Sequence, residues 1–115
     1  MADTVTAEPS TAPGRATLVL LALILVAAVA SVALVINDLS NPFFAEFAAG
    51  VDEALADAGY VTLLGSTGES AERQRAVLTS LLEHDPAGII LSPAEGSDGG
   101  QVRTQVGART PVLVF

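Results

Sequence analysis

From Val32 to Phe115, short apolar runs alternate with longer amphipathic stretches, and this alternation limits the chain to few folds. The runs fall at residues 32–36, 60–64, 88–91 and 112–115, where we expect strands. The run 32–36 is apolar throughout, as is typical of a parallel strand that is covered on both faces. The pattern predicts an α/β fold with a three-layer, Rossmann-like parallel sheet, and right-handed crossovers give the strand order 2-1-3-4.

Helical periodicity occupies the stretches between these runs. Residues 43–58 place apolar side chains at the 3.6-residue spacing, and Gly59 marks the end of that helix. Ser70 is the expected N-cap of a second helix over 71–84, and a weaker helix is expected over 101–108. The inward face of the second helix is predicted to consist of Val77, Leu78, Leu81 and Leu82.

The N-terminal part has a different composition. Residues 1–15 are rich in Pro, Ala, Thr and Ser and are expected to be disordered. The 21 residues 16–36 carry no charge, which is long enough for a membrane helix, but such a span would consume the first strand. A cleaved signal resolves the conflict, since Arg15 precedes an apolar core and Ala28-Val29-Ala30 has the small-x-small form of a cleavage site. A cleaved export signal, an uncleaved anchor and a sequence or reading-frame artefact remain open for this leader, residues 16–30.

Charge and composition exclude several functions for the predicted lobe, residues 31–115. The chain has a net charge of −8 and no Lys, which would repel a phosphate backbone, so we expect no direct contact with nucleic acid. The absence of Cys excludes disulfides and thiolate chemistry. No nucleophile, base and orienting group are assembled, and His84 is the only histidine. We therefore expect neither an enzyme nor a metal site nor a cofactor.

The loop after the first strand is the candidate ligand site. It contains Asp38 and Asn41, followed by two of the chain's four phenylalanines, Phe43 and Phe44. An aromatic ring can stack on a ligand, and the Asn amide suits vicinal hydroxyls. The alternative is that Asn41 or Ser40 only caps the helix and both rings are core. Ser66 and Ser92 follow strand ends on the same edge, where either could contact a ligand or shape its turn.

Five segments carry a resemblance to a known family. They read VALVINDLSNPFFAEF, ADAGY, LLGSTGESAERQRAVLTSLLEH, PAGIILSPAEGS and RTPVLVF. Together they resemble the first lobe of the effector-binding domain of the LacI/GalR transcription regulators, which shares the type I periplasmic-binding-protein fold. The resemblance covers about three quarters of the chain and none of residues 1–30. It implies ligand sensing, and it places Asn41, Phe43 and Phe44 at positions that commonly line the ligand cleft, with Asp38 close by.

Two functions follow as expectations. The first is the sensing lobe of a LacI-family regulator that binds a sugar or similar metabolite, here without its DNA-binding domain and second lobe. The resemblance also implies that the lobe contributes to a homodimer. The second is an exported or membrane-anchored sugar-binding protein of an ABC-type transporter, with membrane contact through residues 16–36. Location depends on this choice: exported or anchored if the leader is genuine, cytoplasmic if the chain is a broken regulator.

Overall fold

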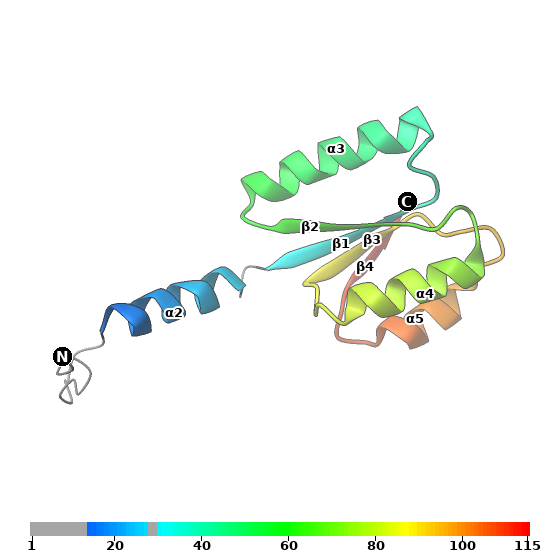
Figure 1. Ribbon diagram of the computed structural model, residues 1–115. Coiled ribbons are helices and arrows are strands. Elements are labelled where there is room, and N and C mark those ends of the chain that lie inside the picture. The colour runs from blue at the N-terminus through cyan, green and yellow to red at the C-terminus, as the bar shows by residue number, and fades with distance from the viewer. Residues whose placement is uncertain (1–13, 28–29) are drawn as a thin grey trace.

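Four parallel strands form one sheet in the computed structural model, which describes residues 14–27 and 30–115. The strands are β1 (Ser31–Ile36), β2 (Val61–Ser66), β3 (Gly88–Leu91) and β4 (Val112–Val114). Their order across the sheet is β2-β1-β3-β4, which confirms the predicted order (Figure 1). β2 extends two residues beyond its prediction because Gly65 and Ser66 still pair with Val35 and Ile36 of β1.

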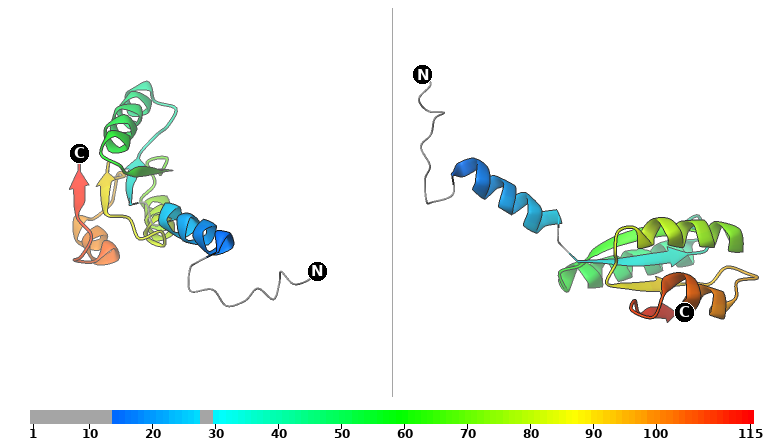
Figure 2. Two further views of the ribbon diagram at one scale, coloured as in Figure 1. Left: turned by 90° about the vertical axis from the view of Figure 1, so that its left-hand side faces the viewer. Right: turned by 90° about the horizontal axis from the view of Figure 1, so that it is seen from below.

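Three helices cover the two faces of this sheet. Helix α3 (Pro42–Asp57) lies on one face, and α4 (Ala71–Leu82) and α5 (Gly99–Val106) lie side by side on the other (Figures 1 and 2). The three layers of the predicted fold are therefore present. Ser70 caps α4 as expected, accepting a hydrogen bond from the Arg73 N–H. Helix α5 begins two residues earlier than predicted because the Asp98 carboxylate caps it.

The main core lies between the sheet and the pair α4 and α5. Its buried members come from β1, β3, α4 and α5, namely Ala33, Val35, Leu78, Ile89, Leu91 and Val106. The other three residues of the predicted inward face of α4, Val77, Leu81 and Leu82, pack against this cluster. Full burial of one large aliphatic side chain contributes about 1.5–3 kcal/mol, so this side of the sheet carries much of the stability.

The opposite face of the sheet is covered only in part. Helix α3 contacts β1 and β2 but has no fully buried residue of its own. Leu34 and Ile36 of β1 are nevertheless completely buried beneath it. Farther along, Leu113 of β4 remains 62% exposed. Apolar surface of the sheet is thus left open beside α3.

The predicted leader forms a short helix, α2 (Arg15–Ala27), which packs against no other described element. Its leucines at positions 18, 20, 21 and 23 are about half exposed. Within residues 14–27 and 30–115, no helix has both the length and the apolar character that a bilayer crossing requires. Residues 31–36 are the central strand, so they are not available for the 16–36 membrane segment that composition suggested. Disorder was predicted for residues 1–15: Arg15 instead begins α2, and positions 1–13 fall outside the described residues. Most of the predicted cleavage site, at positions 28 and 29, also falls outside them.

Close contact between β2 and α4 depends on a glycine. A Cβ placed on Gly65 would lie 2.5 Å from Cγ1 of Val77 and 3.3 Å from Cδ1 of Leu81. We expect Gly65→Ala to destabilise the fold by about 1–3 kcal/mol, because α4 must move away from the sheet. Gly50→Ala is the matched control, since nothing lies within 4 Å of a Cβ there and alanine favours the helix. Urea unfolding measures both, and equal stability of the two variants would contradict the expectation.

Candidate functional site

All four strands end on the same edge of the sheet, and the loops that follow them gather there. Backbone hydrogen bonds fix these loops to the central strand: the Thr67 N–H donates to the Ile36 carbonyl at 2.9 Å, and the Ser92 N–H donates to the Val35 carbonyl at 2.9 Å. On the far side, the Phe115 N–H donates to the Leu91 carbonyl at 3.1 Å. This carboxyl edge is where parallel α/β sheets bind ligands.

The loop between β1 and α3 is held in one shape by its own polar groups. The Asp38 carboxylate accepts hydrogen bonds from the Ser40 hydroxyl at 2.6 Å and from the Ser40 N–H at 2.9 Å. These bonds hold the pKa of Asp38 below its ordinary value of 3.8, with the hydroxyl as the larger cause. Asn41 Oδ1 accepts from the Phe43 N–H at 3.0 Å and caps α3, and Pro42 occupies the first helical turn.

All four phenylalanines of the chain join in one aromatic cluster at this edge. Phe43 and Phe44 meet edge to face with centroids 5.1 Å apart, and Phe43 stacks toward Phe47 at 6.4 Å. Phe47 in turn stacks on Phe115 at 4.2 Å, with the planes 20° apart. The row therefore runs from the start of α3 to the residue after β4. We call these four residues the aromatic wall.

The aromatic wall leaves part of its surface open. Phe43 is 61% exposed, whereas Phe44 is half-buried. One ring of the predicted pair is thus available to a ligand, and the other supports it. Edge-to-face and offset packing of this kind stabilises ring positions beyond simple area burial. The arrangement offers a fixed apolar face beside the polar loop of Asp38 and Asn41.

The other predicted site residues stand on either side of this loop. Ser66 ends β2 and is half-buried, while Ser92 follows β3 and is 7% exposed. The burial of Ser92 favours a structural role, and contact of either serine with a ligand stays a prediction. Asn41 uses its oxygen for the helix cap, as the alternative interpretation expected, and keeps its amide nitrogen as a donor.

Three residues at this edge were missed by sequence reasoning. Phe47 looked like an ordinary apolar position of a helix, and Phe115 like the end of a strand; only the fold brings the two rings together. Asn37 was passed over, although it is a polar residue directly after four fully buried ones. Its Oδ1 is buried and has no hydrogen-bond partner within the described residues. It adds an acceptor at the base of the loop.

Comparison with known proteins assigns this arrangement to a family. Residues 29–115 match the model of the family described as periplasmic binding proteins and sugar binding domain of LacI family. The chain belongs to this family. The match covers the whole predicted lobe, residues 31–115, and together with the strand order it confirms the fold and the resemblance that the sequence predicted.

Named relatives of the LacI-family domain are regulators. A ribose operon repressor of Lactococcus lactis subsp. lactis is 41% identical over 59 residues, which are 51% of this chain and 18% of that protein. The maltose regulon regulatory protein MalI of Escherichia coli is 32% identical over 82 residues, 71% of this chain and 24% of that protein. As predicted, the chain therefore groups with ligand-sensing regulatory domains and not with enzymes.

Solved structures agree with this assignment. A protein assigned as a ribose operon repressor from Burkholderia thailandensis superposes with a TM-score of 0.69 at 34% identity, covering 73% of this chain and 32% of that one. A protein assigned as a LacI-family regulator from Sanguibacter keddieii superposes with a TM-score of 0.57 at 27% identity, covering 74% of this chain and 28% of that one. The LacI-family chain thus spans less than a third of each of these relatives.

Removal of the Ser40 hydroxyl should raise the pKa of Asp38. Because the folded pKa is depressed, the stabilisation that these two hydrogen bonds give the loop is present at neutral pH and is lost as pH falls through that pKa. In Ser40→Ala only the backbone donor remains, so we expect the titration midpoint of Asp38 to move up toward 3.8. The carboxyl carbon resonance of Asp38, followed by NMR against pH, measures this midpoint. Ser70→Ala, which removes the cap of α4 instead, should leave it unchanged.

Proposed function

We propose that this chain is the ligand-sensing lobe of a LacI-family regulator and that it binds a sugar or a similar small polyhydroxylated metabolite at the carboxyl edge. The aromatic wall beside the polar loop is the observation that carries this proposal. A ring face covers the C–H surface of a sugar, while Asn41 supplies a donor to its hydroxyls. The names of two relatives, a ribose operon repressor and a maltose regulon regulator, support this ligand class.

The structure also suggests how tightly these 115 residues would bind. Phe43 and the loop form one wall, and a small ligand is usually enclosed over most of its surface. Affinity should therefore be weak for this chain by itself. A homodimer through this lobe, which the family resemblance implies, is also part of the proposal.

Fluorine-labelled phenylalanine provides a direct test, since all four labels report on the proposed site. On titration with D-ribose, we expect saturable shifts at Phe43 and Phe44 in the millimolar range that weak one-walled binding implies. Phe43→Ala should weaken binding by about tenfold or more, because it removes the exposed ring. Tyr60→Phe is the aromatic control at the opposite end of the sheet and should bind as the unchanged chain does. Absence of saturable shifts for D-ribose and for maltose would contradict the proposal.

A second candidate function is an exported or membrane-anchored solute-binding protein. Helix α2 supports it, because it is apolar, carries exposed leucines and lies before the lobe without packing on it. The matched family also includes periplasmic binding proteins. If the leader is a cleaved export signal, protein isolated from its own host should begin at Ser31. Intact mass and N-terminal sequencing test this, and a chain that retains residues 1–30 in the cytosolic fraction would contradict cleavage.

A further inference from the structure

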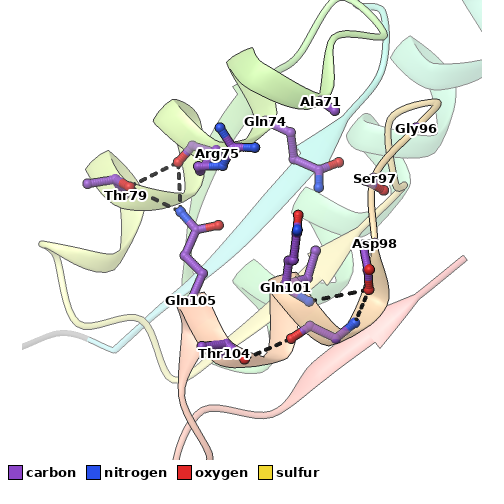
Figure 3. A pocket seen from close by; sticks show the side chains of 12 residues that line it. Ala71, Gln74, Arg75, Thr79, Gly96, Ser97, Asp98, Gln101, Thr104 and Gln105 are labelled. Carbon is purple, nitrogen blue, oxygen red and sulfur yellow. Dashed lines mark hydrogen bonds between the residues drawn. The ribbon is translucent and has the colours of Figure 1, made fainter.

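A hollow lies on the side of the sheet opposite the aromatic wall. It is a groove of about 840 Å³ between α4, α5 and the loop that precedes α5 (Figure 3). All three glutamines of the chain line it, Gln74 from α4 and Gln101 and Gln105 from α5. The glutamines are therefore not spread over the protein, since all of them lie at this groove. The volume is within the range of small-molecule sites, roughly 300–1,000 Å³.

Gln74 gives the groove a fixed hydrogen-bond donor. The residue is 3% exposed, and its Oε1 accepts a 2.6 Å hydrogen bond from the Ala94 N–H. Because a backbone N–H can only donate, the amide oxygen must face Ala94, and the amide nitrogen is forced into the groove (Figure 3). No acceptor for this nitrogen is found in the part of the chain that the structure describes. This nitrogen faces the open groove, where water can reach it and where an acceptor of a ligand can take the place of that water.

Hydrogen-bond donors and acceptors both surround the amide nitrogen of Gln74. Gln101 extends from α5 toward Gln74 (Figure 3). Asp98 uses Oδ1 to cap α5, with the Gly100 N–H at 2.7 Å, and its second oxygen remains an acceptor. Gln105 closes the far end, since its Nε2 donates to the Arg75 carbonyl at 2.7 Å and to the Thr79 hydroxyl at 3.0 Å. The groove therefore presents donors and acceptors together.

The charge and composition of the lining residues further limit the classes of ligand that the groove can bind. Arg75 and Asp98 are its only charged residues and have opposite signs, so neither an anion nor a cation is favoured overall. No aromatic ring lines the groove, which leaves no stacking face for a flat heterocycle. Hydroxyl groups both donate and accept, and they match such a mixed surface. We propose that this groove binds a neutral molecule with adjacent hydroxyl groups, at a site separate from the aromatic wall.

Selective labelling of glutamine tests this site alone. With ¹⁵N in the glutamine side chains, the three amide signals of the full chain all come from the groove. On titration with xylitol, we expect saturable shifts of Gln74 and Gln101. The probe 1,5-pentanediol, which has the same number of carbons but no adjacent hydroxyls, should give none. Shifts that grow linearly, or that are equal for both probes, would overturn the proposal.

Two variants separate binding from folding. Gln74→Glu keeps an oxygen for the Ala94 N–H and replaces only the nitrogen that faces the groove, so xylitol binding should weaken by about tenfold or more. Gln101→Ala changes an exposed position and should weaken binding without altering the unfolding midpoint. Phe43→Ala should leave the glutamine shifts unchanged, which distinguishes failure at this groove from failure at the aromatic wall. Unaltered xylitol binding in both glutamine variants would also overturn the proposal.

Discussion

The structure depends on burial of the central strand β1 between two paired neighbours. Ala33, Leu34, Val35 and Ile36 have no exposed surface, with α3 on one side and α4 on the other. β1 pairs with β2 along six residues and with β3 along four, so its backbone groups are satisfied on both edges. A slip of β1 by one residue toward its start would place the polar Asn37 at the buried position of Ile36, which disfavours that register. The position of every later loop follows from the register of β1.

That register is what assembles the candidate site. The end of β1 directs Asp38 and Asn41 out of the carboxyl edge, and the cap at Asn41 sets where α3 begins. Phe43 and Phe47 are four residues apart and therefore share one face of α3. Phe115 reaches Phe47 only because β4 pairs with β3, which in turn pairs with β1. The aromatic wall is thus a product of strand order as much as of the local sequence.

These dependencies explain how far the sequence could be interpreted. Strand positions and order were predictable, since continuous apolar runs and helical spacing are local signals. The last two residues of β2 were not, because Gly65 and Ser66 look like turn residues and become strand only by pairing with β1. Asp98 as a cap could have been anticipated from its type, which would have placed the start of α5 correctly. The contact of Phe47 with Phe115 and the joining of all three glutamines had no local signal at all.

The loop after β3 borders both candidate surfaces, the carboxyl edge and the groove between α4 and α5. This shared loop constrains how the two surfaces can act. The Ser92 N–H is tied to β1 at the carboxyl edge, and two residues later the Ala94 N–H is tied to Gln74 in the groove. Ser92 and Ala94 are both buried, so this short segment has little freedom to move independently of the core. A ligand that draws on the amide of Gln74 therefore acts on a segment that also borders the edge. The aromatic wall lies across the sheet from the groove, and residues 92–94 with the core beneath them are the physical connection between the two surfaces.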